Sequence, residues 1–292
     1  NWLRPSAGIH GLEEMYQRHL NHLRFGDAPL RPRYIFNATD LVFGANFMFD
    51  TGGQDRTMRV GDDVAGYTRP PSWLPLSRAI AASSGFPPAF HPMPYDLPAD
   101  KLLEGRYRGR DRKRLISKMR LSDGGTFDNM GVEPVWTDHQ TLVVSDGGAV
   151  LDAEPHSRTR GMKRFAEVAS HGGSSIRKRW LISDLESGIM NGTYWGIGGS
   201  PSRYGASLGY SKQLAREVIS EVRTDLDAFS VEEIGILENH GYLLADAAIR
   251  KHMAHFITCE ATLAVPHPQW LDEAAVRYAM SGSNHRSVLG RW

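Results

Sequence analysis

Two aspartates, Asp123 in the stretch LSDGG and Asp146 in the stretch VVSDGG, each stand directly before a pair of glycines. The residues that precede each aspartate are typical of a short β-strand. Because glycine tolerates positive φ, the chain can turn sharply where the strand ends, and the carboxylate is then held at a fixed, accessible place. A general base, or a carboxylate that orients a histidine, needs such a place. The alternative is that each aspartate is only a turn residue, which is the commoner role in an isolated pattern of this kind.

The surroundings of Asp123 favour the chemical interpretation. Upstream, residues 37–39 read Asn-Ala-Thr and residues 82–88 read Ala-Ser-Ser-Gly-Phe-Pro-Pro, and downstream Asn129 follows. In this order the motifs resemble those of the patatin-like phospholipase family, in which a strand, a helix of small residues and an Asp-Gly-Gly turn succeed one another. We therefore prefer Asp123 to Asp146 as the base, and we expect Asp146 to end a neighbouring strand.

The resemblance extends beyond the core motifs. Residues 175–197 and 232–250 are similar to the downstream region of a bacterial branch of the family, so that the likeness runs from about Arg31 to about Arg250. It implies part of a patatin-like three-layer α/β sandwich with a helical C-terminal extension. We expect a single domain over residues 1–292, with a sheet-containing catalytic core over about 1–150 and a mainly helical part over about 160–282.

The chemistry that the resemblance implies is ester hydrolysis by a serine–aspartate dyad, without metal or cofactor. The serine of a Gly-x-Ser-x-Gly elbow attacks the acyl ester, and Asp123 takes its proton. Gly124, Gly125 and Asn129 support the site. The implied substrate is a phospholipid or a similar long-chain acyl ester of a membrane.

The elbow itself is missing upstream of Asn37, which is where the family carries it. Serines follow glycines at Ser174, Ser175 and Ser200, but no glycine stands two residues after any of them, and no glycine-rich oxyanion stretch precedes Asn37. Two interpretations remain. Either an N-terminal patatin half carrying the serine lies on another polypeptide or a cleaved fragment, or the chain is an inactive scaffold that binds protein or lipid. Because the chain begins at Asn1 and not at a methionine, we favour the first; whether it forms a further oligomer stays open.

Composition and sequence motifs argue against several other classes of protein. The formal net charge is +1, which gives no overall electrostatic case for nucleic acid. The single cysteine, Cys259, excludes an intramolecular disulfide, and no motif with metal-ligand spacing occurs. No apolar run approaches the roughly 20 residues of a membrane span, and we expect a cytoplasmic protein that can lie at a membrane surface. The basic stretch 106–114 is either a contact for lipid phosphates or a solvated hairpin tip.

Periodicity predicts the elements that would position these residues. We expect a hairpin over 34–50, a long loop over 51–72 and a small-residue helix that ends at Gly85. A longer helix should run from Met162 to about Gly188, with a break at its interior glycines. Beyond about residue 212 the pattern is mainly helical.

Overall fold

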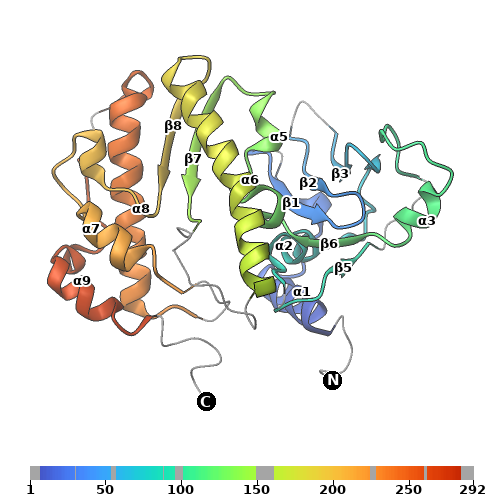
Figure 1. Cartoon of the computed structure of the whole chain (residues 1–292), viewed down its shortest axis with the longest axis horizontal. Helices are drawn as coiled ribbons and strands as arrows, with labels where there is room; N and C mark the ends of the chain where they lie inside the picture. Colours follow the sequence, from blue (N-terminus) through green and yellow to red (C-terminus); the bar gives the residue numbers. More distant parts are fainter. Residues whose placement is uncertain are drawn as a thin grey trace. The chain divides into compact units, whose positions relative to one another are not determined.

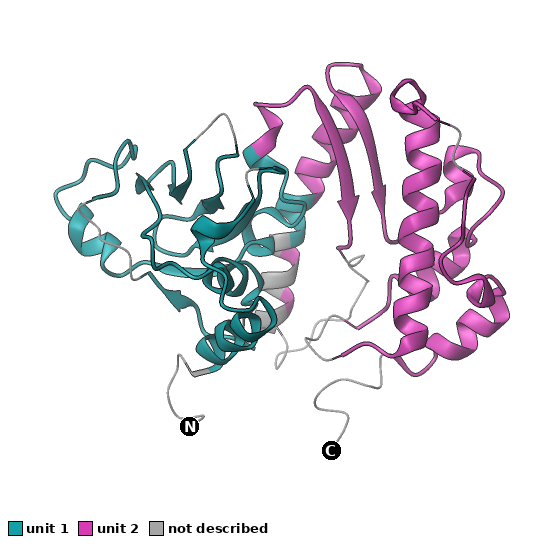
Figure 2. Ribbon diagram, turned by 180° about the vertical axis from the view of Figure 1, so that it is seen from behind, with its two compact units in different colours: residues 1–134, 169–174 teal, residues 135–168, 175–292 magenta. Residues whose placement is uncertain are grey.

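The computed structural model describes residues 7–29, 31–53, 57–87, 89–95, 101–148, 161–223, 228–259 and 262–283. The chain is a mixed α/β protein that divides into two compact units (Figure 2). Unit 1 comprises residues 1–134 and 169–174, and unit 2 comprises residues 135–168 and 175–292. Each unit is described by itself.

Unit 1 is built on a six-stranded antiparallel sheet in the order β4-β3-β2-β1-β6-β5 (Figure 1). Its strands are β1 (Ile35–Asp40), β2 (Ala45–Asp50), β3 (Arg59–Asp62), β4 (Gly66–Thr68), β5 (Met93–Pro94) and β6 (Arg120–Asp123). The predicted hairpin over 34–50 is confirmed, with Asn37 opposite Met48. Its turn ends at Gly44, whose φ of 62° favours glycine.

The prediction of a loop over residues 51–72 is wrong, because this segment contains β3 and β4. Its glycines and aspartates, which suggested a loop, build a tight hairpin. Gly61 has a φ of 141°, and a Cβ there would collide with the backbone of Gly66 on the paired strand. The Asp62 carboxylate accepts the N–H groups of Val64 and Ala65 at 2.8 and 2.6 Å, which closes the turn.

Asp40 plays the corresponding role in the first hairpin, and the two turn-closing carboxylates meet inside unit 1. Its Oδ1 accepts the N–H groups of Val42 and Phe43 at 2.7 and 3.3 Å. Asp40 and Asp62 are both 0% exposed, and the charge of Asp40 acts to raise the pKa of Asp62. Among the described residues, neither Oδ2 atom has a protein donor. Two buried carboxylates that repel each other favour a state in which one of them carries a proton.

Unit 1 also contains helical elements. They are α1 (Ala7–His19), the short 3-10 turn η1 (Phe25–Asp27), α2 (Leu76–Ser84), α3 (Arg112–Ile116) and α4 (Gly125–Asp128). The predicted helix that ends before Gly85 is confirmed as α2. Its residues Ala79, Ala81 and Ala82 are 0% exposed, and such small side chains let the helix pack closely against β1 and β6. The core beneath is aromatic, with Phe47 in edge contact with Phe49 at 5.2 Å.

Unit 2 holds a two-stranded parallel sheet of β7 (Thr141–Asp146) and β8 (Asn191–Gly196). Its main helices are α8 (Val231–His252) and most of α6 (Gly161–Glu186), of which residues 169–174 belong to unit 1. The predicted break at the interior glycines of α6 is wrong, because the helix is continuous there. A capping box starts α8, in which Ser230 accepts from the N–H of Glu233 and Glu233 accepts from the N–H of Ser230. Smaller elements are α5 (Glu133–Trp136), η3 (Pro201–Tyr204), α7 (Lys212–Leu214), the π-turn η4 (Ala215–Ile219), η5 (Ala254–Phe256), η6 (Pro268–Trp270) and α9 (Glu273–Met280). The predicted helical character beyond residue 212 is confirmed.

Candidate functional site

Asp123 is the last residue of β6, the strand next to β1 in the sheet of unit 1. It stands opposite Ala38, and its carbonyl accepts the hydroxyl of Thr39 at 2.7 Å. On the other side its N–H donates to the carbonyl of Gly85, just past the end of α2, at 3.2 Å. The Asn-Ala-Thr strand, the small-residue helix and the Asp-Gly-Gly turn are thus joined directly around one carboxylate. Because the sheet is antiparallel, Asp123 does not lie at an edge where the carboxyl ends of parallel strands meet. Its position is set by its contacts with β1 and with the end of α2.

An open pocket of about 350 Å³ lies beside Asp123, within unit 1. Its wall comes from β1, the end of α2 and the turn that follows β6. The lining residues are Ile35, Phe36, Asn37, Ser83, Asp123, Gly124, Gly125, Asp128, Asn129, Met130 and Gly131. All four residues that the sequence assigns to the site, namely Asp123, Gly124, Gly125 and Asn129, are therefore brought together at one pocket.

The two glycines after Asp123 are needed for different reasons. A Cβ on Gly124 would overlap the carbonyl of Asn37, so the turn can approach β1 only without a side chain. A Cβ on Gly125 would lie 2.9 Å from Oδ1 of Asp123 and 2.8 Å from Oδ1 of Asn129. These two side chains therefore flank Gly125, whose own N–H donates to Oδ1 of Asp123 at 2.7 Å. The glycine pair is thus required to hold the carboxylate and the amide close together.

The electrostatics of Asp123 suit proton transfer. Burial raises the pKa of the Asp123 carboxyl above its ordinary value, and the hydrogen bond from the N–H of Gly125 opposes this only in part. No lysine or arginine among the described residues contributes to the balance. A carboxylate whose pKa is raised toward neutrality is a better general base than an ordinary aspartate.

Sequence reasoning missed three polar members of the pocket wall. Asn37 had been treated only as part of a strand motif, yet it lines the pocket, and its Oδ1 is buried without a donor among the described residues. Asp128 is 3% exposed, with Oδ2 bound to the N–H of Glu133 at 2.8 Å and Oδ1 lacking a donor. Ser83 is the third. The signal for Asn37 was present, because its motif already belonged to the resemblance.

Asp146 is held quite differently, in unit 2. It ends β7, which pairs with β8 and not with any strand of the six-stranded sheet, so the expectation that it ends a strand neighbouring β6 is wrong. Its Oδ2 lies 2.5 Å from Nζ of Lys178 and accepts the hydroxyl of Tyr194 at 2.7 Å. Burial acts to raise the pKa of Asp146, but these bonds and the N–H of Gly148 outweigh it and hold the pKa low. An ion-paired carboxylate of this kind is a structural group.

The other candidate serines do not line the pocket. Ser200 is buried in unit 2 and donates to the carbonyl of Tyr210 at 2.8 Å, while Ser174 and Ser175 lie within α6. Among the described residues, Ser83 is the serine in the wall of the Asp123 pocket.

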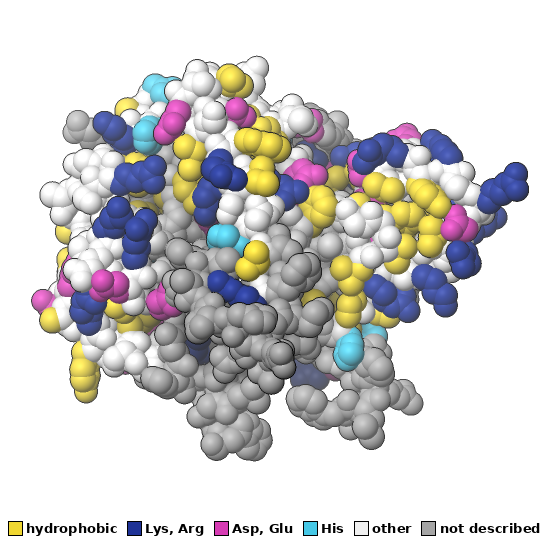
Figure 3. All heavy atoms as spheres, in the orientation of Figure 1, with side chains coloured by type: hydrophobic (Ala, Val, Ile, Leu, Met, Phe, Trp, Pro, Cys, Tyr) yellow, Lys and Arg dark blue, Asp and Glu magenta, His cyan; other side chains and the backbone are white. Residues whose placement is uncertain are grey.

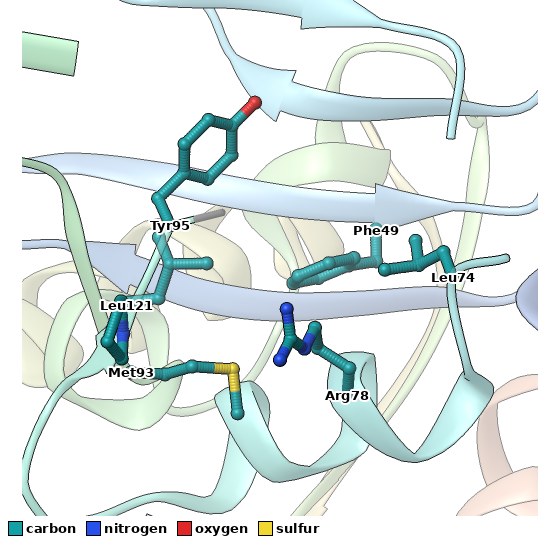
Figure 4. Close-up of a pocket in the computed structure, with 7 residues that line it drawn as sticks. Phe49, Leu74, Arg78, Met93, Tyr95 and Leu121 are labelled. Carbon is teal, nitrogen blue, oxygen red and sulfur yellow. The ribbon is translucent and has the colours of Figure 1, made fainter. Parts of the chain in front are cut away.

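A second cavity lies between α2 and the sheet in unit 1, and its volume is only about 10 Å³ (Figure 4). Its wall is mainly apolar, with Phe49, Leu74 and Met93 around it. Arg78 belongs to this wall and is bound to Glu13, with Nε 3.1 Å from Oε1. Such a space holds at most one water molecule, so it is a packing gap and not a ligand site.

Comparisons with protein-family models, with curated proteins and with solved structures found no match. Within the described ranges, no group of three or more His, Cys, Asp or Glu side chains is placed to hold a metal ion. In the same part of the chain, no helix has both the length and the apolar character needed to cross a bilayer.

Proposed function

We propose that this chain is part of a patatin-like acyl hydrolase that cleaves phospholipids or similar long-chain esters, with Asp123 as general base. The observation that carries the proposal is the place of Asp123, at a strand end beside an open pocket of about 350 Å³. Burial without a cationic partner raises its pKa, whereas the rival Asp146 is tied to Lys178. A base must be accessible and free to accept a proton, and Asp123 alone of the two meets that condition.

In this proposal the nucleophile is an elbow serine supplied by an N-terminal half on another polypeptide or a cleaved fragment. The hydroxyl proton passes to Asp123 as the serine oxygen attacks the ester carbonyl, and it is then given to the leaving alcohol. In the second step water attacks the acyl-enzyme and gives its proton to Asp123, which returns it to the serine oxygen as the fatty acid leaves. Gly125 and Asn129 keep the carboxylate in place, and Gly124 allows the turn to approach β1.

The sheet of unit 2 supports the proposal that a second polypeptide adds to this chain. Parallel strands occur almost only in larger sheets that are covered on both faces, and two strands alone are marginally stable. β7 and β8 form a two-stranded parallel sheet, and Val143 in β7 is 49% exposed. A further strand at the edge of this sheet would satisfy its open N–H and C=O groups.

The second candidate is an inactive patatin-like scaffold that binds protein or lipid. The observation that favours it concerns the one Gly-x-Ser-x-Gly sequence of the chain, residues 205–209. It lies in a loop of unit 2 between η3 and α7 and not at a strand–turn–helix elbow, and its serine, Ser207, does not line the Asp123 pocket. Peptide mapping of the purified protein separates the two. A co-purifying polypeptide with an elbow serine supports the enzyme, and a chain that is well folded and alone supports the scaffold.

The decisive experiment is fatty-acid release from mixed liposomes by the assembled protein. Asp123→Asn keeps the shape of the carboxylate but removes its basicity, and we expect a loss of about 10²–10⁴-fold in rate, the usual contribution of a general base. Asp146→Asn is the control and should keep most of the activity when its folding is verified. Ser83→Ala should also remain active, because the proposed serine is not in this chain. Activity that survives in Asp123→Asn and disappears in Asp146→Asn would contradict the assignment.

A further inference from the structure

The charge of this chain is concentrated in one segment. Residues 101–120 contain nine Lys and Arg and two Asp and Glu, a formal charge of +7. The whole chain carries only +1, so the remaining residues carry −6. A chain whose net charge is close to zero therefore has a strongly positive segment in unit 1. Such a concentration of positive charge is typical of a site that binds an anionic partner.

The side chains of this segment point into solvent. Arg106, Arg108, Arg110, Lys113 and Arg114 are all exposed, and we call them the basic surface. Arg106 pairs with Asp63 at 2.5 Å and Arg114 pairs with Asp111 at 3.4 Å. For Arg108, Arg110 and Lys113 no ion pair occurs among the described residues. These three cations are available to a partner.

The segment that carries the basic surface is firmly attached to the sheet. Leu103 and Tyr67 exchange backbone hydrogen bonds of 2.8 Å in both directions, and the N–H groups of Arg106 and Tyr107 donate to the carbonyls of Asp63 and Val64. Arg112 turns inward and donates to the carbonyls of Ala65 and Leu102. The cations are therefore displayed by an ordered loop and by α3, so that little conformational entropy is lost when they bind.

Hydrophobic side chains accompany the cations. Leu103, within the same segment, is 66% exposed. Figure 3 shows hydrophobic side chains bordered by Lys and Arg over the part of the molecule that holds α3. Exposed leucine among arginine and lysine is the composition of surfaces that lie in the interface of a bilayer.

We propose that the basic surface, with Leu103, docks this protein on an anionic phospholipid bilayer. The cations meet the lipid phosphates, and Leu103 enters the boundary between head groups and acyl chains. Nucleic acid fits less well, because single-stranded chains are bound with aromatic rings on which bases stack. The one aromatic residue of the segment, Tyr107, bonds Asp111 through its hydroxyl at 2.5 Å and packs on Phe43. The choice of a lipid surface rests on the proposed function, whereas the binding itself can be measured without catalysis.

The test is partitioning of the full chain onto vesicles made of equal parts phosphatidylglycerol and phosphatidylcholine. Each basic residue near an anionic surface strengthens partitioning about fivefold. The triple variant Arg108→Gln, Arg110→Gln, Lys113→Gln should therefore bind about 100-fold more weakly. The matched control replaces Lys212, Arg216 and Lys251, three exposed cations of unit 2, by glutamine and should bind as the unmodified chain does. Leu103→Ala should weaken binding and leave its dependence on salt unchanged.

Equal loss in the two triple variants would overturn the proposal, and so would equal binding to vesicles of phosphatidylcholine alone. A chain that binds a single-stranded oligonucleotide more tightly than the anionic vesicles, with no effect of Leu103→Ala, would identify nucleic acid as the partner and would also overturn it. Fatty-acid release is measured separately. Binding without hydrolysis would contradict the proposed function alone, and hydrolysis of a long-chain ester dispersed in detergent micelles, without vesicle binding, would contradict only this inference.

Discussion

The buried pair of Asp40 and Asp62 should make unit 1 lose stability as the pH rises, and Asp62→Asn should remove that loss. Burial is the largest cause that raises the pKa of Asp62, from 3.8 to about 7, and the charges of Asp40 and Asp63 act in the same direction. The N–H groups of Ala65 and Val64 oppose it. Burial also raises the pKa of Asp40. The hydroxyl of Tyr95, which is buried without a partner among the described residues, is close enough for both carboxylates to raise its own pKa.

The sign follows from proton binding. Between pH 4 and 7 the folded chain holds a proton on the pair, and the unfolded chain has released it, so the free energy of unfolding falls with rising pH. The contribution is complete below the unfolded pKa of 3.8 and is lost as the pH passes through about 7. A shift of about three pKa units corresponds to an upper limit of about 4 kcal/mol, of which about 3 kcal/mol falls between pH 5 and 8.

Asp62→Asn replaces the titrating carboxyl by a neutral amide, whose carbonyl can still accept from the N–H groups of Val64 and Ala65. The assay is urea unfolding at pH 5 and pH 8, with hydrogen exchange of peptides that span β1 and β3 to locate the effect in unit 1. The unmodified chain should lose about 3 kcal/mol more than Asp62→Asn between the two pH values. Contributions of other titrating groups cancel in this difference.

Asp63→Asn is the matched control, because Asp63 is the adjacent carboxylate and its side chain is 56% exposed. It should keep most of the pH dependence of the unmodified chain, because the charge of Asp63 is the smallest of the causes that raise the pKa of Asp62. The reasoning is refuted if the unmodified chain and Asp62→Asn have the same pH dependence, since the pair would then hold no proton in the folded state.

Two further substitutions test the site and its rival. Gly125→Ala places a Cβ 2.8 Å from Oδ1 of Asn129 and 2.9 Å from Oδ1 of Asp123, and the displaced base should lower the rate of fatty-acid release about 100-fold. The control is Gly147→Ala, where a Cβ meets no atom within 4 Å and the rate should not change. Equal rates in the two variants would contradict the close fit around Gly125. Lys178→Met leaves the 5% exposed Asp146 without its cation, and we expect a loss of roughly 1–3 kcal/mol in unfolding free energy at pH 7. Because the pKa of Asp146 is lowered in the folded state, the ion pair stabilises the folded chain above the unfolded pKa, and the loss should shrink as acid protonates the carboxylate. The control Lys212→Met, at an exposed position, should change the unfolding free energy little at any pH.

The sequence by itself determined the local elements with strong, short-range signals. Two short strand-forming stretches on either side of Gly44 define the β1–β2 hairpin, and a run of small residues ended by Gly85 defines α2. The periodicity beyond about residue 212 likewise predicts helix, and α8 lies there. Each signal depends on residues within one helix or one hairpin, so it can be recognised without knowing the rest of the molecule.

Only the tertiary structure decided what the aspartates do. Asp123 and Asp146 share the same local pattern, yet one lines a pocket and the other is bound to Lys178 and Tyr194, which are 32 and 48 residues away in the chain. Segment 51–72 resembled a loop because its glycines and aspartates are turn residues, and its strands depend on pairing with β2. The partners that fix burial, charge and pKa are distant in sequence, and no local pattern records them.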